Sequence, residues 1–224
     1  VHAWGMTELS PVGTHGLLSQ HHHRELTQDQ RLDLQARQGR RAFGVDLKIV
    51  DEAGQALPHD GVAAGDLYVR GHGIISSYFE DPAATDAAFD SAGWFGTGDV
   101  ASIDPEGFLI IQDRAKDLIK SGGEWISSID LENIVMGHPE VANCAVIAVP
   151  HPKWDERPLL VVVPRGSYKV TKAEIDNLLL THVARWQLPD AIEFVEQLPL
   201  TATGKVSKLT LRQQFAAFEL PRET

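Results

Sequence analysis

Residues 113–127 read DRAKDLIKSGGEWIS, and the character of the 224-residue chain changes at this stretch. It places the cations Arg114, Lys116 and Lys120 just before a pair of glycines. A buried core does not require this combination, although a solvated surface loop could carry it. Cations beside glycines also suit a segment that meets phosphate groups and whose backbone is approached closely. The sequence on either side has to decide between these two interpretations.

The chain is acidic, and its charge is uneven. It has 20 Lys and Arg against 31 Asp and Glu, a net charge of −11. Up to Asp113 there are 7 basic and 17 acidic residues, a balance of −10, whereas the remainder has 13 and 14, a balance of −1. Nucleic-acid binding is therefore not expected. The single cysteine, Cys144, excludes an internal disulfide and favours the cytoplasm, and no apolar run is long enough to span a bilayer.

The half before residue 113 is expected to be rich in strands. Residues 45–50, VDLKIV, alternate apolar and polar side chains, as a half-buried strand does, and residues 65–71 form a second strand. Residues 98–114 predict a hairpin around the turn DPEG. Helices are expected after Thr27, which acts as N-cap, with Gly39 beyond the end, and from the proline of DPAATDAAF.

The half after residue 113 predicts the element order αββαβα. Its strands are two apolar runs and a shorter third segment, at 141–150, 157–164 and 191–198. Its helices are one stopped by Gly137, one from Thr171 to Trp186 with Thr171 and Glu174 as capping box, and one at 207–215. The expected fold class is α+β, with domains at 1–113 and 114–224 and a hinge within 113–118.

Three further motifs carry residues that could do chemistry. In HAWGMTELSP, the hydroxyl of Thr7 beside the carboxylate of Glu8 could serve phosphate and Mg²⁺, although for this motif alone a helix-capping threonine is the favoured interpretation. In GWFGTGDVA, Asp99 follows glycines and could accept hydrogen bonds from ribose hydroxyls, or simply cap a turn. In PLTATGK, Lys205 lies on a turn without the glycine-rich run of a Walker A loop.

Two other segments are interpreted as structural. His21 to His23 are consecutive, so their side chains diverge and are not spaced for a metal; we expect a solvated loop there. Residues 149–158, VPHPKWDERP, contain three prolines and are expected to be a stiff connection between two strands.

In this order, the motifs resemble the adenylate-forming superfamily of acyl-CoA synthetases, luciferases and peptide-synthetase adenylation domains. The matching segments are GMTE, GWFGTGD, DRAKDLIKSGGEWIS and TATGKVSK, and the resemblance covers the whole chain. SGGEWISSIDLEN and HPKWDERPLLVVVPR look most like bacterial medium- and long-chain fatty acid–CoA ligases. The resemblance implies the β-rich, barrel-like end of the large adenylation domain, followed by a small mobile α+β domain.

The resemblance also implies a role for each matching position. In the large domain these are Trp4 on the adenine, Thr7 on phosphate, Glu8 on Mg²⁺, Asp99 on the ribose hydroxyls and Arg114 beside it. In the small domain, Lys116 would be the hinge and Lys205 the lysine that bridges carboxylate and α-phosphate. Lys120, Gly122 and Gly123 would form the loop that enters for thioester formation and lines the pantetheine tunnel.

The implied substrates are ATP, CoA and a fatty or other small carboxylic acid, with AMP as the bound product and Mg²⁺ as cofactor. The family's glycine- and serine-rich phosphate loop has no counterpart in this sequence. We therefore expect a C-terminal part of such an enzyme, inactive on its own. Transfer of the acyl group to a carrier-protein phosphopantetheine, and a non-catalytic binding module, stay open as alternatives, as does a homodimer.

Overall fold

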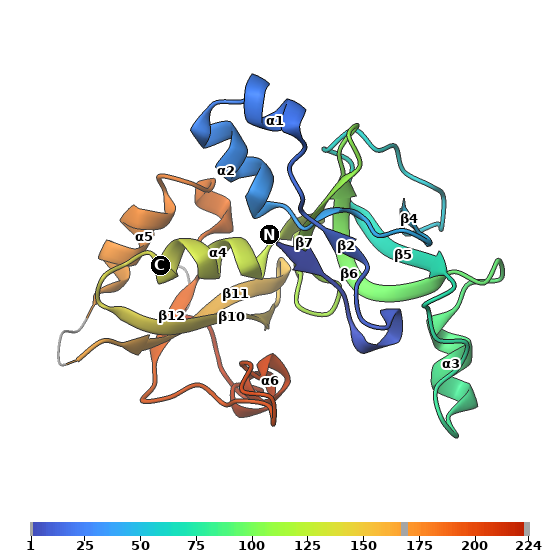
Figure 1. Ribbon diagram of the computed structural model, residues 1–224. Helices are drawn as coiled ribbons and strands as arrows, with labels where there is room; N and C mark the ends of the chain where they lie inside the picture. Colours follow the sequence, from blue (N-terminus) through green and yellow to red (C-terminus); the bar gives the residue numbers. More distant parts are fainter. Residues whose placement is uncertain (1, 167–169, 222–224) are drawn as a thin grey trace. The chain divides into compact units, whose positions relative to one another are not determined.

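The computed structural model describes residues 2–166 and 170–221 (Figure 1). The chain divides into two compact units, Val1–Ala115 (unit 1) and Lys116–Thr224 (unit 2). Each unit is built around its own sheet, which agrees with the expected α+β class. Among the described residues, every helix is too short or too polar to traverse a bilayer.

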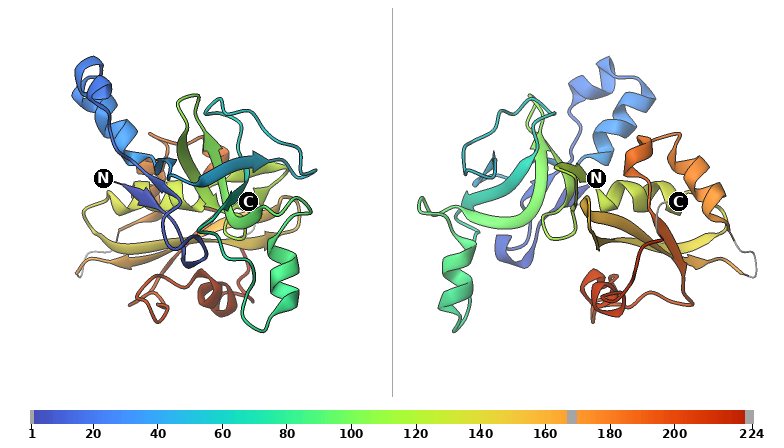
Figure 2. Two further views of the ribbon diagram at one scale, coloured as in Figure 1. Left: turned by 45° about the vertical axis from the view of Figure 1, so that its right-hand side comes forward. Right: turned by 180° about the vertical axis from the view of Figure 1, so that it is seen from behind.

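Unit 1 contains a seven-stranded antiparallel sheet in the order β1-β2-β3-β7-β6-β5-β4 (Figures 1 and 2). The strands are β1 (Ala3–Trp4), β2 (Thr14–His15), β3 (Gly39–Arg41), β4 (Val45–Val50), β5 (Gly65–Gly71), β6 (Phe95–Ile103) and β7 (Phe108–Arg114). The predicted strands at 45–50 and 65–71 and the predicted hairpin are confirmed. Alternation buries Ile49, Leu67 and Leu109 in one apolar cluster, which holds the central strands together.

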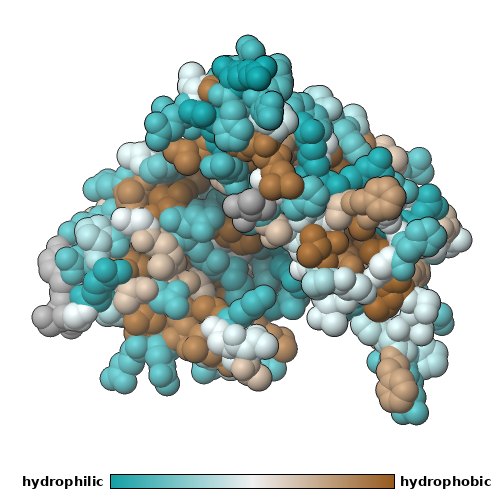
Figure 3. All heavy atoms as spheres, in the orientation of Figure 1, coloured by the Kyte–Doolittle hydropathy of each residue, from teal (hydrophilic) through white to brown (hydrophobic). Residues whose placement is uncertain are grey.

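The helices of unit 1 are short and lie outside this sheet. They are the 3₁₀ helix η1 (Thr7–Leu9), α1 (Gln20–Glu25), α2 (Gln28–Ala36) and α3 (Pro82–Ala88). Thr27 caps α2 as predicted, in a reciprocal capping box with Gln30. The helix ends earlier than expected, and Gly39 begins β3 instead of terminating α2. The side chains of α1 and α2 on the face seen in Figure 3 are mostly hydrophilic.

The expectation of a solvated loop at His21 to His23 is wrong. These residues lie in α1, and His22 is only 4% exposed. Its Nδ1 accepts a hydrogen bond from the backbone N–H of Ser19, and its Nε2 lies 3.0 Å from the Glu106 carboxylate. The imidazole thereby acts in place of the Glu or Gln of a capping box, a substitution that the residue types did not indicate.

Unit 2 contains a five-stranded sheet. Its order is β10-β11-β8-β9, and β12 pairs in parallel with residues 159–162 of β11. The strands are β8 (Ile119–Ser121), β9 (Glu124–Ile126), β10 (Val141–His151), β11 (Asp155–Pro164) and β12 (Ala191–Phe194). The two long apolar strands are confirmed, but they extend into the segment 149–158 that was expected to be a stiff connection, so only residues 152–154 lie between them. The hairpin of β8 and β9, within the stretch quoted first, was not predicted.

Helices cover both faces of the unit 2 sheet (Figures 1 and 2). α4 (Ser128–Met136) and α5 (Lys172–Leu179) bury Leu131 and Ile175 in one cluster, while α6 (Lys208–Gln214) buries Leu211 in the other. Alternate residues of β10 and β11 contribute to the two clusters, which explains why these strands are apolar throughout.

Two elements of unit 2 are shorter than predicted. The capping box of Thr171 and Glu174 is present, but α5 ends at Leu179 and a separate 3₁₀ turn, η2 (Arg185–Gln187), contains Trp186. The hydroxyl of Thr181 donates to the Leu178 carbonyl at 2.7 Å and so competes with the continuation of the helix. The third strand, expected to reach residue 198, ends at Phe194.

Cys144 lies in the core of unit 2, on β10, and is 5% exposed. Its thiol donates to the Glu132 carbonyl, with Sγ and O 3.5 Å apart. Burial, reinforced by the negative charge of Glu132 and opposed by Lys208, raises the pKa of the thiol to about 12.

Candidate active site

A buried carboxylate in unit 1 brings together three of the predicted site residues. Asp99 lies on β6 directly opposite Arg114 of β7, and Trp4 ends β1. The indole Nε1 of Trp4 donates to Oδ2 of Asp99 at 2.9 Å, and Nε of Arg114 lies 2.8 Å from Oδ1. Asp99 is 4% exposed, whereas half of the Arg114 side chain is open to solvent. Segments 95 residues apart in the sequence thus meet at one carboxylate.

The environment of Asp99 raises the pKa of this carboxyl above its usual value. Burial is the largest cause, and the charge of Arg114 and the hydrogen bond from Trp4 oppose it without cancelling it. Each carboxylate oxygen can accept more than one hydrogen bond, so both can take a further donor. A ligand with two neighbouring hydroxyl groups would match this arrangement.

Thr7 and Glu8 lie in η1, a few residues after Trp4. The N-cap position of η1 is Met6, so the interpretation of Thr7 as a helix-capping residue is wrong. Oε1 of Glu8 accepts a hydrogen bond from the hydroxyl of Tyr78 at 3.1 Å. Burial, together with Glu8, raises the pKa of this tyrosine. Tyr78 was missed by sequence reasoning, because an aromatic residue in an irregular segment carries no periodic signal.

The donor set at Glu8 fits a magnesium ion that is shared with phosphates. Mg²⁺ prefers hard oxygen ligands and is usually held by one or two carboxylates, substrate phosphates and water. Glu8 and Thr7 could supply such oxygens, since only Oε1 of Glu8 is engaged by Tyr78. No group of three or more His, Cys, Asp or Glu side chains that could form an all-protein metal site occurs in the described part of the chain.

The glycine pair of unit 2 forms the turn of the β8–β9 hairpin. Gly122 and Gly123 have φ values of +62° and +91°, which disfavour residues with a side chain. A Cβ on Gly122 would lie 2.7 Å from the ring of Trp154, whereas a Cβ on Gly123 would meet no atom within 4 Å. The ammonium of Lys120, on β8, lies 4.6 Å from the centre of the Trp125 ring.

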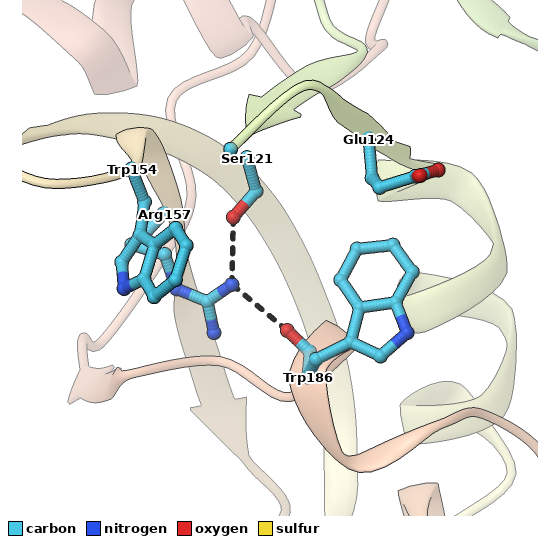
Figure 4. Close-up of a pocket in the computed structure, with 6 residues that line it drawn as sticks. Ser121, Glu124, Trp154, Arg157 and Trp186 are labelled. Atoms are coloured by element: carbon cyan, nitrogen blue, oxygen red, sulfur yellow. Dashed lines mark hydrogen bonds between the residues drawn. The ribbon is translucent and has the colours of Figure 1, made fainter.

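A pocket of about 480 Å³ opens beside this hairpin (Figure 4). Its lining is Ser121, Gly122, Glu124, Trp154, Arg157 and Trp186. The guanidinium of Arg157 donates to Ser121, to the main-chain carbonyls of Trp186 and Leu188, and to Asp190. These bonds engage all its nitrogens, so Arg157 shapes the pocket as a fixed planar group. The two tryptophans offer aromatic surface to a ligand.

Lys205 lies on a well-defined turn elsewhere in unit 2. The Thr201 N–H donates to the Lys205 carbonyl at 2.7 Å, and the Lys205 N–H donates to the Thr201 hydroxyl oxygen at 3.2 Å. Gly204 has a φ of +79°. The Lys205 side chain is exposed, and its ammonium contacts no acceptor within the described ranges. The structure thus presents a mobile cation on a fixed backbone.

Lys116 is the first residue of unit 2. The N–H of Ala115 donates to the Gly98 carbonyl at 2.9 Å, within unit 1, whereas Asp117 is buried in unit 2. Lys116 itself is exposed. It therefore separates the last residue anchored in one unit from the first residue buried in the other.

Comparison with known proteins identifies the class. The chain matches two family descriptions, AMP-binding enzyme over residues 1–79 and AMP-binding enzyme C-terminal domain over residues 130–205. The chain belongs to this family of adenylate-forming enzymes, and the resemblance seen in its motifs is confirmed.

Two curated relatives and one solved structure show which members of the family this chain is similar to. It is 54% identical to 3-methylmercaptopropionyl-CoA ligase of Ruegeria lacuscaerulensis and 52% identical to medium-chain-fatty-acid–CoA ligase of Ectopseudomonas oleovorans, in each case over 96% of this chain and 39% of the relative. Among solved structures, o-succinylbenzoate CoA synthetase from Bacillus subtilis, in complex with its acyl-adenylate intermediate, aligns with a TM-score of 0.81 and 27% identity. That alignment covers 99% of this chain and 42% of the synthetase. The chain thus spans about 39% of the length of the curated relatives.

Proposed function

We propose that the full-length protein is an ATP-dependent acyl-CoA synthetase that activates an aliphatic carboxylic acid and transfers the acyl group to CoA. The observation that carries this proposal is the buried carboxylate of Asp99, with Trp4 on one oxygen and Arg114 on the other. Such a carboxylate suits the two hydroxyls of a ribose, and the adjacent indole offers a surface for adenine. Thr7 and Glu8 follow in the same segment, where the phosphates would lie.

In the first half-reaction, a carboxylate oxygen of the acid attacks the α-phosphorus of ATP and the bond to pyrophosphate breaks. Negative charge accumulates between the two reacting anions. The ammonium of Lys205 is exposed and free to approach that centre, where it would stabilise the transition state. When bound, Mg²⁺ at Glu8 would neutralise phosphate charge.

In the second half-reaction, a thiol sulfur attacks the acyl carbon, AMP leaves and the thiol proton is released. The positive φ of Gly122 and Gly123 gives the hairpin a side-chain-free turn that a thin pantetheine chain could pass. The pocket with Trp154 and Trp186 lies beside that turn and would take the nucleotide end of CoA. The positive charge of Lys120 would attract its phosphates.

The relatives support an aliphatic acid, since one is named for a medium-chain fatty acid and another for 3-methylmercaptopropionate. CoA is favoured over a carrier protein because the half of the chain after Asp113 has a balance of only −1, against −10 before it. An anionic cosubstrate meets less repulsion there.

The test measures the two half-reactions separately in the full-length protein. Pyrophosphate release with ATP and a series of acids from 3-methylmercaptopropionate to palmitate reports the first, and CoA thioester formation from preformed acyl-AMP reports the second. Lys205→Ala should abolish the first and largely spare the second. Lys172→Ala, at a partly exposed lysine of the same unit, is the matched control and should change neither.

Three outcomes would count against the proposal. Absence of acid-dependent pyrophosphate release by the wild-type protein would favour a non-catalytic binding module. Acyl transfer to a phosphopantetheinylated carrier protein but not to CoA would favour the carrier alternative. Equal loss of both half-reactions in Lys205→Ala would contradict the role given to this lysine.

A further inference from the structure

Two ion pairs anchor the last helix of unit 2, which follows directly after the turn that carries Lys205. Lys208 is the first residue of α6, and Arg212 lies one turn later. The two cations reach different parts of the unit. Lys208 contacts α4, and Arg212 contacts the segment just after Lys116.

The first pair ties α6 to α4. Nζ of Lys208 lies 2.7 Å from Oε1 of Glu132 and 2.5 Å from the hydroxyl of Ser128. The same Glu132 oxygen accepts the backbone N–H of Val146, on β10, at 2.7 Å. The side chains of the pair are 14% and 19% exposed, so water competes little for them. α4 begins two residues after the β8–β9 hairpin.

The second pair ties α6 to the start of unit 2. Nη1 of Arg212 lies 2.6 Å from Oδ1 of Asp117, whose side chain is only 9% exposed. Asp117 immediately follows Lys116, the residue proposed as the hinge. A charge-assisted bond across 95 residues of sequence therefore connects the hinge end of the unit with α6.

The Lys205 turn is continuous with this anchored helix. The N–H of Ser207 donates to the Pro199 carbonyl at 2.8 Å, and Leu200 and Val206 form a β-bridge. The hydroxyl of Ser207 then caps α6 by accepting the Thr210 N–H. Lys205 is thus joined to the anchored helix through residues 206–208, each of which makes one of these contacts.

We propose that Lys208 and Arg212 are positioning residues that hold the Lys205 turn at a set place relative to the hinge end of unit 2. This inference rests on the proposed function of Lys205. The side chain of Lys205 is long and free, so only its backbone can define where the ammonium arrives. The ion pairs fix that backbone from two directions, and a displacement of about 1 Å at a reacting centre can lower a rate by up to roughly a hundredfold.

The experiment removes each pair as a unit, so that no buried charge is left alone. The variants are Asp117→Asn with Arg212→Met, and Glu132→Gln with Lys208→Met, in the full-length protein. The matched control is Lys172→Met with Asp176→Asn, an ion pair of the same unit that lies on α5 at 2.7 Å and is more exposed. Arg212→Lys keeps the charge and is the rescue variant.

We expect each double variant to lower the turnover of acyl-adenylate formation roughly tenfold or more, with the KM for ATP changed less than about twofold. Thioester formation from preformed acyl-AMP should remain near the wild-type rate, and Arg212→Lys should recover most of the adenylation. Amide hydrogen exchange should become faster in residues 199–207 in the double variants and stay unchanged in the control.

A parallel fall of both half-reactions would mean that the pairs only stabilise unit 2, and it would overturn the inference. So would unchanged adenylation together with unchanged exchange in residues 199–207. If the wild-type protein shows no adenylation, the proposed function fails. Exchange in residues 199–207 then still decides whether the pairs position the turn.

Discussion

Burial of the ionised Asp99 carboxylate lowers the stability of the folded unit, and the proposed binding of a ligand by this carboxylate accounts for its presence. Burial raises the pKa of its carboxyl despite Arg114 and Trp4, which means that the ionised form is less favourable in the folded unit than in the unfolded chain. A purely structural position would be better filled by a neutral side chain. The charge is therefore best explained by a ligand that it binds.

We predict that Asp99→Asn weakens ATP binding about tenfold or more, since hydrogen bonds to a charged acceptor contribute roughly 1.5–3 kcal/mol each. The same substitution should leave the melting temperature of unit 1 unchanged or higher. Isothermal titration calorimetry measures the affinity for ATP, and differential scanning calorimetry measures the melting temperature. The control is Asp46→Asn. Asp46 is an exposed residue of β4 that pairs with Arg41, and its substitution should leave the affinity for ATP unchanged.

The stability difference between the wild-type protein and Asp99→Asn should depend on pH. Because the pKa of Asp99 is raised in the folded unit, its unfavourable contribution is present at neutral pH and disappears as the pH falls through that raised value. Any stability advantage of Asp99→Asn should accordingly shrink on acidification. A variant that is less stable than wild type at neutral pH would show that Asp99 is mainly a structural partner of Arg114.

At the scale of the element, the two turn glycines of the β8–β9 hairpin allow the effect of backbone conformation to be distinguished from the effect of a contact with Trp154. Gly122 needs both a positive φ and the absence of a side chain against Trp154, whereas Gly123 needs only the positive φ. Gly122→Ala should lower thioester formation from preformed acyl-AMP more than Gly123→Ala does. The backbone cost common to both is about 1–2 kcal/mol. Adenylation rates and melting temperatures of the two variants complete the comparison.

Equal effects of the two alanines would show that the contact with Trp154 does not matter for the hairpin. A loss of adenylation as large as the loss of thioester formation would show that the hairpin supports the whole unit. Neither result is expected, because only a Cβ on Gly122 would meet Trp154. Both substitutions also leave Ile119 and Ile126 unchanged, the hairpin residues that pack in the core of unit 2.

Long elements were predictable from the sequence because periodicity accumulates along them. β4 was found from alternation and β10 and β11 from near-continuous apolar runs, and the capping box placed the start of α5. The three-residue strands β8 and β9 and the two-residue strands β1 and β2 are too short to show a period, so tertiary pairing alone defines them.

Some contacts of the candidate site could be predicted from the sequence, and others could not. Asp99 and Arg114 were expected side by side from the resemblance, and the register of β6 and β7 places them so. The partnership of Glu8 with Tyr78 and the contact of His22 with Glu106 depend on segments that meet only in the folded chain. No local pattern in the sequence could indicate them.

At the scale of the whole molecule, the boundary between the units is a single residue wide. Ala115 is bonded within unit 1 and Asp117 is buried within unit 2, so we propose Lys116 as the position that would absorb a rotation of one unit against the other. Lys116→Pro should spare adenylation better than thioester formation. Proline fixes its own φ near −65° and restricts the residue before it, which would limit a rotation of unit 2 between the two proposed half-reactions.

Single-turnover measurements of the two half-reactions test this prediction, with Lys116→Ala as the control that keeps the backbone free. A normal rate of CoA thioester formation in Lys116→Pro would rule out Lys116 as the hinge. Equal damage by Lys116→Ala would instead point to a role for the lysine side chain.

The burial of Cys144 has a consequence for chemical selectivity. An acyl-adenylate is a reactive acyl donor, and a thiolate on the protein would be acylated in competition with the intended acceptor. With a pKa of about 12, only about one Cys144 in 10⁵ is ionised at neutral pH, and the sulfur is enclosed between α4 and β10. In the proposed reaction, the one cysteine of this chain would thus be protected from self-acylation, and the activated acyl group would be left to the thiol of CoA.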